Sequence, residues 1–255
     1  MNAAAKPLQP LVDAIVGARR TRAQAPREAQ LEPAERRIGY ATQQAVATAL
    51  GESVAGWKVG MLADGTPMAA PMFTGDIRPS GATWKLPAHG VLVVEVEVAL
   101  RLARDLPVRA GNAYTRDEVA AAVGEVLIGI ELLASRFAGD GFPPFPLHLA
   151  DNLGNAGYVI GEATRDFASL DLARLRCRYA LDGVQVHDAM GGHPQGDPWL
   201  PVLACLNEGL MPLGGFRAGQ VVTTGSLIKP ARLDAPTQVT ATIDDVGSVA
   251  LTLQR

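Results

Sequence analysis

One run of the chain, residues 91–100, is apolar except for two glutamates and reads Val-Leu-Val-Val-Glu-Val-Glu-Val-Ala-Leu. A nearly continuous aliphatic run of this length is typical of a strand that is buried on both faces of a sheet. Glu95 and Glu97 are two residues apart, so their side chains point to the same face of such a strand. Burying either carboxylate without a partner is very costly in free energy. The run therefore requires a cation, an arginine or a shared proton beside these glutamates.

A second strand-like run, residues 126–133, carries one more glutamate, Glu131, in apolar company. If the two strands are neighbours, Glu95, Glu97 and Glu131 form a three-carboxylate site for Mg²⁺ or Mn²⁺, with water or substrate oxygens in the remaining positions. The alternative is that residues 91–100 form an edge strand with Glu95 and Glu97 facing solvent. Periodicity alone does not decide between the two.

The rest of the chain predicts a helical beginning and a large β-rich remainder. Apolar residues recur at helical spacing over 8–22 and 33–50, and Thr115 with Glu118 predicts a capping box at the start of a further helix. A last helix is expected after Asp197-Pro198, and Asp182-Gly183 predicts a hairpin. We expect an N-terminal helical region over 1–55 and a β-rich catalytic core over 56–255. The expected strands cover 56–61, 91–102, 126–133, 157–161, 174–181, 184–188, 220–224, 239–243 and 248–253.

Composition narrows the class of protein without indicating chemistry. The 255 residues are 48% hydrophobic and 19% charged, which excludes a largely disordered chain, and the net charge of −3 makes no general case for nucleic acid. No apolar run reaches the roughly 18 residues of a membrane helix, and the first residues lack the pattern of an export signal. We therefore expect a cytoplasmic protein that neither binds a membrane nor contains disulfides. A cluster of arginines near the N-terminus is interpreted as a solvated helix face, with a phosphate-binding patch as the alternative; its members are Arg19, Arg20, Arg22, Arg27, Arg36 and Arg37.

Several short motifs, taken in order, resemble one family. They are Gly-Trp-Lys-Val-Gly at 56–60, Glu-Val-Glu at 95–97, Glu131 followed by Ser135-Arg136, Ala-Asp-Asn at 150–152, and Ala-Gly-Gln-Val-Val-Thr-Thr-Gly at 218–225. Together they resemble the 2-keto-4-pentenoate hydratase and 4-oxalocrotonate decarboxylase branch of the fumarylacetoacetate hydrolase superfamily. The resemblance implies an α+β fold, with a mixed β-roll or β-sandwich-like core, flanking helices and a small N-terminal helical region.

The resemblance also assigns roles to residues of this sequence. It implies Mg²⁺, or Mn²⁺, held by Glu95, Glu97 and Glu131, and it implies catalytic roles for Lys58, Asp76 and Asp151. The implied substrate-binding residues are Asn152, Thr224 and Gly225. From the residues alone, Lys58 is better interpreted as a surface lysine and Asp76 as a turn residue, whereas Asp151-Asn152 fits a substrate-binding loop and an Asx turn equally well. His148, three residues before Asp151, is the one histidine that we consider as a site candidate.

The implied activity is that of a magnesium-dependent lyase, a hydratase that adds water to a small 2-hydroxy-2,4-dienoate or 2-oxo-enoate to give a 4-hydroxy-2-oxo acid in aromatic-compound catabolism. The implied assembly is a homo-oligomer. Alternatives are a decarboxylase of an oxalocrotonate-like 2-oxo diacid, an acylpyruvase or β-diketone hydrolase, and a non-catalytic partner subunit. Thr74-Gly75 stands where the family has an acidic pair, and Asp76 is displaced by one residue. These departures lie where substrate is bound, so they leave the choice among these reactions open.

Overall fold

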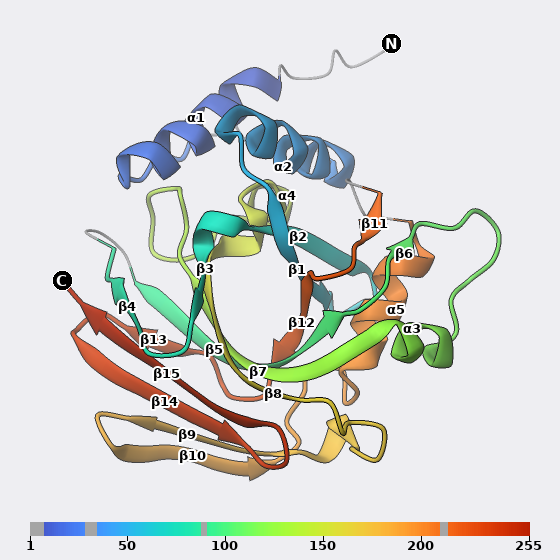
Figure 1. Cartoon of the computed structure of the whole chain (residues 1–255). Helices are drawn as coiled ribbons and strands as arrows, with labels where there is room; N and C mark the ends of the chain where they lie inside the picture. Colours follow the sequence, from blue (N-terminus) through green and yellow to red (C-terminus); the bar gives the residue numbers. More distant parts are fainter. Residues whose placement is uncertain (1–7, 29–34, 88–90, 210–213) are drawn as a thin grey trace.

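The computed structural model describes residues 8–28, 35–87, 91–209 and 214–255 (Figure 1). None of the described helices is long and apolar enough to cross a membrane. In chain order the helices and strands are α1 Leu8–Thr21, α2 Arg36–Leu50, β1 Val54–Met61, β2 Pro67–Phe73, β3 Ile77–Pro79, β4 Ala82–Lys85, β5 Leu92–Leu102, β6 Leu106–Pro107, α3 Arg116–Ala122, β7 Val123–Leu133, α4 Phe145–Ala150, β8 Asn155–Thr164, β9 Arg176–Leu181, β10 Val184–Met190, α5 Trp199–Asn207, β11 Gly215–Phe216, β12 Val221–Ser226, β13 Ala231–Leu233, β14 Thr237–Ile243 and β15 Gly247–Gln254.

An eight-stranded mixed sheet forms the centre of the molecule. Its order is β2-β1-β12-β5-β7-β8-β3, and β13 pairs with β5 beyond the end of β12. The long strands β5, β7 and β8 curl so that the sheet makes a deep curved wall (Figure 1). Along β5 the residues at positions 92, 94, 96, 98 and 100 are buried in the main apolar core on one face of this wall, while the glutamates point to the other face.

A five-stranded sheet, ordered β10-β9-β14-β15-β4, packs against the outer face of the curved wall. Strand β15 lies on β8 and β7, and the close approach occurs at Gly161 of β8. Asp182 and Gly183 turn between β9 and β10 with φ of 49° and 81°, the left-handed conformations that a two-residue hairpin turn of type I′ needs. The two sheets thus form a β-sandwich-like core with α+β organisation.

Helices α1 and α2 lie across one open end of the curved sheet (Figure 1). Their apolar stripes pack on each other and on α4, with Leu11, Ile15, Val46 and Leu147 buried in one cluster. Gly51 ends α2 in the left-handed conformation (φ 67°), and its N–H caps the last carbonyl groups. The helices therefore close the end of the sheet nearest to β1 and β2.

The structure confirms the strands expected from alternation and apolar runs, and it confirms the capping box, in which Glu118 N–H donates to the Thr115 hydroxyl. The edge-strand alternative for residues 91–100 is wrong, because β5 has hydrogen-bonded neighbours on both sides. Strand β2 is not among the expected strands, and its sequence contains Pro67 and Pro71. It is tolerated because β2 is an edge strand whose outer side needs no donors. The boundary at residues 55 and 56 stays a prediction, as parts of 1–55 lie outside the described residues.

Replacing Gly161 by alanine tests how the two sheets pack. A Cβ atom at this position would lie 2.5 Å from the Ser248 carbonyl oxygen and 2.7 Å from Val249 Cβ, so the sheets would have to move apart. We expect Gly161→Ala to lower the free energy of unfolding by about 1–3 kcal/mol in urea titrations. The matched control is Gly17→Ala in helix α1, where a Cβ meets nothing within 4 Å. It is expected to raise stability by roughly 0.5–1 kcal/mol, and equal stabilisation of both variants would contradict the packing described here.

Candidate metal centre and active site

Three glutamates meet on the concave face of the large sheet. Strands β5 and β7 are antiparallel neighbours, with Glu95 directly opposite Glu131 and Glu97 opposite Gly129. One carboxylate oxygen from each glutamate lies within 4.8 Å of the others. Glu97 and Glu131 are fully buried, and the Glu95 side chain is 15% exposed. The register of β5 and β7 therefore brings the three carboxylates together at one point, and Glu95 is the most exposed of them.

Lys58 of β1 is the cation that faces this cluster. Its Nζ lies 3.0 Å from Glu131 Oε2 and 3.9 Å from Glu95 Oε2. Burial lowers the pKa of Lys58, but the charges of Glu131, Glu95 and Glu97 outweigh burial and leave the pKa raised. Lys58 is therefore an ammonium ion, and when all three carboxylates are ionised the site carries two more negative than positive charges.

Burial and mutual repulsion make it costly for all three carboxylates to be ionised. Burial, followed by the charges of Glu131 and Glu95, raises the pKa of Glu97 well above its ordinary value. Burial also raises the pKa of Glu131, although Lys58 opposes the shift. Glu97 Oε2 is buried without a hydrogen-bond partner among the described residues. A buried, unpartnered carboxylate oxygen beside two more carboxylates fits a hard divalent cation, which prefers oxygen ligands and would neutralise the excess charge.

Two further buried hydroxyl groups border the carboxylates. Tyr158 of β8 lies over Gly129, where a Cβ would come within 2.0 Å of its hydroxyl oxygen. Burial raises the pKa of Tyr158 well above its ordinary value, and the charges of Glu97 and Glu131 raise it further. Thr223 of β12 is the register partner of Lys58, and its side chain interacts with Glu97. These hydroxyl groups make the floor of the site polar inside an otherwise apolar sheet.

An ion pair behind the cluster holds Glu131 in place. The Asp151 carboxylate accepts hydrogen bonds from the Arg136 backbone N–H (3.0 Å) and Nε (2.5 Å). Arg136 Nη1 in turn donates to the Asn155 carbonyl (2.7 Å), and Asn155 Nδ2 donates to Glu131 Oε1 (2.7 Å). Burial raises the pKa of Asp151, and Arg136 opposes this shift. Asp151 is thus linked to the carboxylate cluster through Arg136 and Asn155.

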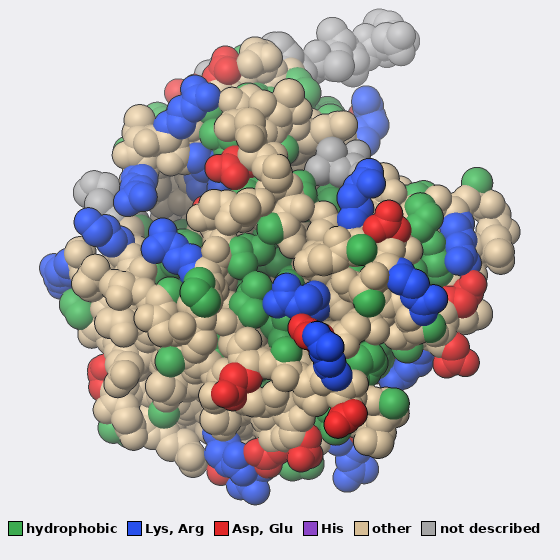
Figure 2. Space-filling model, viewed as in Figure 1, with side chains coloured by type: hydrophobic (Ala, Val, Ile, Leu, Met, Phe, Trp, Pro, Cys, Tyr) green, Lys and Arg blue, Asp and Glu red, His purple; other side chains and the backbone are tan. Residues whose placement is uncertain are grey.

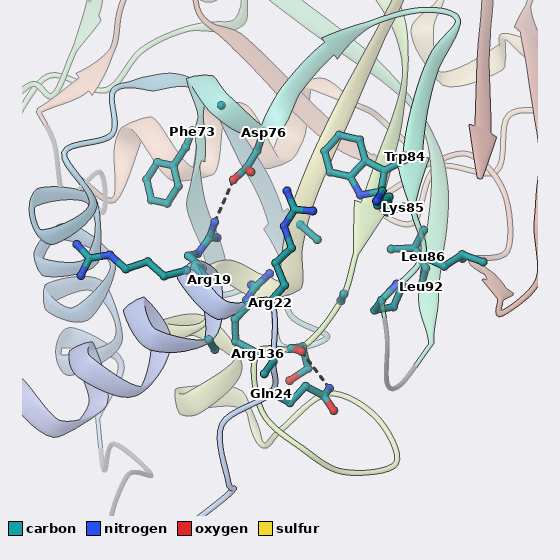
Figure 3. Close-up of a pocket in the computed structure, with 18 of the residues that line it drawn as sticks. Arg19, Arg22, Gln24, Phe73, Asp76, Trp84, Lys85, Leu86, Leu92 and Arg136 are labelled. Atoms are coloured by element: carbon teal, nitrogen blue, oxygen red, sulfur yellow. Dashed lines mark hydrogen bonds and ion pairs between the residues drawn. The ribbon is translucent and has the colours of Figure 1, made fainter. Parts of the chain in front are cut away.

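Asp76 lies apart from the carboxylates, at the wall of a cavity of about 840 Å³ (Figure 3). Its carboxylate accepts a hydrogen bond from Arg19 Nη1 at 3.0 Å, and its side chain is 27% exposed. Arg19 Nη2 also donates to the Asn155 carbonyl at 3.4 Å. Asn155 therefore contacts Glu131 with its side chain and the wall of the cavity with its backbone, which places the cavity next to the cluster.

The residues assigned to substrate binding, Thr224, Gly225 and Asn152, differ in how far the protein itself already occupies their polar groups. The Thr224 hydroxyl donates to the Val98 carbonyl (2.7 Å), and the Thr224 carbonyl is 2.7 Å from His193 Nε2. Gly225 has φ of 121°, and a Cβ there would lie 3.1 Å from the same histidine nitrogen. Asn152, also in a left-handed conformation (φ 50°), donates to the Pro71 carbonyl, and its own side-chain oxygen is buried without a partner among the described residues. The Thr224 hydroxyl is thus engaged by the sheet.

His148 lies close enough to Lys58 for that charge to act on it. Burial, followed by the charges of Lys58 and Arg136, lowers the pKa of His148 to about 3. Its ring packs against Phe142 with 4.8 Å between ring centroids. The imidazole is therefore neutral at physiological pH and contributes no charge to the site.

Sequence reasoning missed Tyr158, Thr223, Asn155 and Arg19 as neighbours of the candidate site. A weak signal existed for Tyr158, because Gly129 leaves a gap two residues before Glu131 that a large side chain on an adjacent strand can fill. No local signal marked Asn155 or Arg19, since their contacts depend on segments far away along the chain.

Comparison with known sequences gives relatives of one kind. No family model matches the chain. It is 30% identical over 230 residues to a 2-keto-4-pentenoate hydratase of Burkholderia vietnamiensis, and the match covers 84% of this chain and 85% of the relative. It is 31% identical over 174 residues to a 2-hydroxyhexa-2,4-dienoate hydratase of Comamonas testosteroni. That match covers 67% of this chain and 64% of the relative, so it spans just under two thirds of the latter.

Solved structures show the same fold. The 4-oxalocrotonate decarboxylase from Pseudomonas putida G7, complexed with magnesium and adipate, superposes with a TM-score of 0.83 at 21% identity over 97% of both chains. Fumarylpyruvate hydrolase from Pseudomonas aeruginosa, in complex with Mn²⁺ and pyruvate, is more distant, with a TM-score of 0.54 at 13% identity over 73% of this chain and 78% of that one. The chain thus shares its fold with 4-oxalocrotonate decarboxylase and fumarylpyruvate hydrolase. By the length and identity of its sequence matches, it belongs to the 2-keto-4-pentenoate hydratase family.

Proposed function

We propose that the protein is a divalent-metal-dependent hydro-lyase that adds water to a small 2-hydroxy-2,4-dienoate. The observation that carries this proposal is the convergence of Glu95, Glu97 and Glu131 beside Lys58, next to a cavity large enough for a small organic acid. The names of the relatives at 30% identity and above support a hydratase. In this reaction the dienol takes up a proton at C5 and loses the proton of its 2-hydroxyl group, which gives a 2-oxo-3-enoate. Water then adds across the C3–C4 bond, with its hydroxyl on C4 and its proton on C3, to give a 4-hydroxy-2-oxo acid.

We infer that the three glutamates hold Mg²⁺ or Mn²⁺. When bound, the ion supplies a Lewis acid that stabilises negative charge developing on the 2-oxo oxygen. The chain itself orients the donors: Asn155 holds the Glu131 carboxylate by a hydrogen bond, and the buried hydroxyl groups of Tyr158 and Thr223 border Glu97.

Lys58 is the group that we propose to bind the substrate carboxylate or to donate a proton. It stays charged, and its side chain is 13% exposed, so it is not sealed inside the sheet. Asp76 is proposed as the acid–base or water-positioning group, with Arg19 holding its carboxylate. We propose that Asp151 acts by positioning Arg136, since its carboxylate oxygens are occupied by that residue. Asn152, Thr224 and Gly225 remain proposed substrate contacts, and a homo-oligomer remains the expected assembly.

A parallel product assay tests the reaction. The magnesium-loaded protein is incubated with 2-hydroxypenta-2,4-dienoate and, separately, with an oxalocrotonate-like diacid. We expect a 4-hydroxy-2-oxo acid as product without loss of carbon. Release of CO₂ from the diacid, with no hydration of either acid, would overturn the hydratase in favour of the decarboxylase.

Glu97→Gln tests the metal centre. The amide removes one anionic ligand and leaves the size of the side chain unchanged, so we expect kcat/KM to fall at least about 100-fold and Mg²⁺ binding by calorimetry to weaken by a similar factor. The matched control is Glu125→Gln on the neighbouring strand β7, because the Glu125 carboxylate pairs with Arg101 and Arg165 and lies outside the cluster. Wild-type Mg²⁺ affinity in Glu97→Gln would contradict the assignment.

Metal removal is expected to make thermal stability depend on pH. The pKa of Glu97 and of Glu131 is raised in the folded protein, so their contribution to stability is fully present below the ordinary glutamate pKa of about 4.5 and is lost as the pH rises above it. In EDTA we therefore expect Tm to fall from mildly acidic to neutral pH. Magnesium should restore Tm at neutral pH, because an ion that binds only the folded state stabilises it. Superimposable Tm profiles with EDTA and with magnesium would refute this electrostatic picture.

A further inference from the structure

His193 is a buried polar residue that the proposed reaction leaves unused. Figure 2 shows charged side chains over the surface of the molecule, whereas His193 is only 6% exposed. It lies in the loop between β10 and α5, where its Nε2 is 2.7 Å from the Thr224 carbonyl oxygen and its Nδ1 accepts a hydrogen bond from the Gln195 backbone N–H. One neutral tautomer satisfies both contacts, the one in which Nε2 carries the proton. Burial lowers the pKa of His193, which keeps the ring neutral at physiological pH.

The loop that carries His193 fits closely against the end of β12. Gly192 has φ of 101°, and a Cβ there would lie 2.8 Å from the carbonyl oxygen of Leu227, the residue after β12. Gly191, with φ of 68°, would bring a Cβ to 2.9 Å from the Ala173 carbonyl oxygen. Glycine adopts this backbone at both positions without a steric penalty. Two consecutive glycines therefore allow the loop to approach β12 and place His193 against it.

Strand β12 is irregular where His193 contacts it. Two of its residues, Thr224 and Gly225, lie opposite a single residue of β5, Val98, which is the pattern of a β-bulge. The Thr224 hydroxyl donates to the Val98 carbonyl at 2.7 Å, and the Thr224 carbonyl accepts from His193. Gly225 has φ of 121°, and a Cβ there would lie 3.1 Å from His193 Nε2. The bulge is therefore held by hydrogen bonds to β5 and to His193.

The bulge turns two polar side chains toward the carboxylate cluster. Side chains alternate along a regular strand, so residues three apart point to opposite faces of a sheet. Thr223 and Ser226 are three apart, yet they pair with Ala99 and Glu97, which share the concave face of β5. The extra residue of the bulge makes this possible, because it shifts the alternation by one.

The position of the Thr223 hydroxyl depends on the backbone of β12. Thr223 is the register partner of Lys58, and its side chain lies close to Glu97. Thr223 Oγ1 and Glu97 Oε2 are nevertheless both buried without a hydrogen-bond partner among the described residues. Because no hydrogen bond of its own to these residues fixes the hydroxyl, the strand must hold it in place, and the bulge directly follows Thr223.

We propose that His193 is a positioning residue for the candidate active site. Through its hydrogen bond to the Thr224 carbonyl it holds the bulge of β12, and the bulge holds the Thr223 hydroxyl beside Glu97. Both of its hydrogen bonds are to backbone atoms, so it acts through β12 and not on the substrate. The inference rests on the proposed function, in which Glu97 is a metal ligand.

Replacing His193 by leucine or by glutamine tests the role of the Nε2 donor. Leucine removes the hydrogen bond to the Thr224 carbonyl, and we expect kcat/KM and the Mg²⁺ affinity measured by calorimetry both to fall by about tenfold, the value of one buried hydrogen bond. Glutamine offers an amide N–H at the end of a side chain of similar reach, so His193→Gln should stay within about threefold of the wild type in both measurements. Equal losses in the two variants would contradict a role that depends on this donor.

A double-mutant cycle separates positioning from a general effect on the fold. Thr223→Val removes the hydroxyl group and keeps the shape of the side chain. If His193 acts through Thr223, His193→Leu should cost little further kcat/KM or Mg²⁺ affinity once Thr223 is valine, and additive losses would overturn the inference.

The matched control is Val239→Ala on β14, a buried position of the outer sheet whose strand pairs with β9 and β15. It destabilises the fold by opening a cavity, and we expect it to leave kcat/KM and Mg²⁺ affinity unchanged. Losses as large as those of His193→Leu would show that lower stability alone explains them, and the inference would fail.

The calorimetric measurement distinguishes failure of this inference from failure of the proposed function. If the wild type binds Mg²⁺ but hydrates no dienoate, the proposed reaction fails, and the Mg²⁺ affinities of the His193 variants still decide the inference. If the wild type and His193→Leu bind Mg²⁺ equally well and have equal kcat/KM, the inference fails and the hydratase stands. A wild type that binds no Mg²⁺ overturns both, since Glu97 is then not a metal ligand.

Discussion

The burial of three carboxylates in an apolar sheet is the constraint on which the rest of this structure depends. Removing such charges from water is costly unless other charges and hydrogen bonds compensate. Lys58 of β1, which is separated from β5 by β12, supplies part of that compensation. Asn155 supplies a hydrogen bond to Glu131. Among the described residues, one buried oxygen of Glu97 has no hydrogen-bond partner. The three carboxylates therefore fit the divalent cation that we propose for this site.

Ion pairs and hydrogen bonds around the cluster hold its residues in position. Behind Glu131, the Arg136–Asp151 pair fixes Asn155, and on the cavity side Arg19 holds Asp76. Each buried cation near the cluster has a carboxylate partner, so the positive charge left over lies farther out, where solvent and substrate reach it. The carboxylate cluster is thus negative, and the described lining of the neighbouring cavity is rich in cationic side chains, although the net charge of the chain is only −3.

Local patterns predicted most of the β core because alternation and apolar runs report burial directly. They failed at β2, whose prolines argue against a strand unless its edge position is known. They also left open whether β5 is central or peripheral, since a run of apolar residues describes the strand and not its neighbours. Asp151 illustrates how far the sequence predicts the role of a site residue. Its motif predicted that it belongs to the site, but only its contact with Arg136 indicates a positioning role.

The sequence by itself determined that β5 is a buried strand, that Glu95 and Glu97 share one face, and that the chemistry of their surroundings requires a cation. These conclusions follow from the side-chain period of a strand and from the cost of desolvating a charge. Only the tertiary structure decided that Glu131 lies opposite Glu95, that Lys58 lies 3.0 Å from Glu131, and that Arg19 and Arg136 pair with Asp76 and Asp151. The reason is physical: such contacts depend on strand order and register between segments far apart in the chain, which local periodicity does not encode.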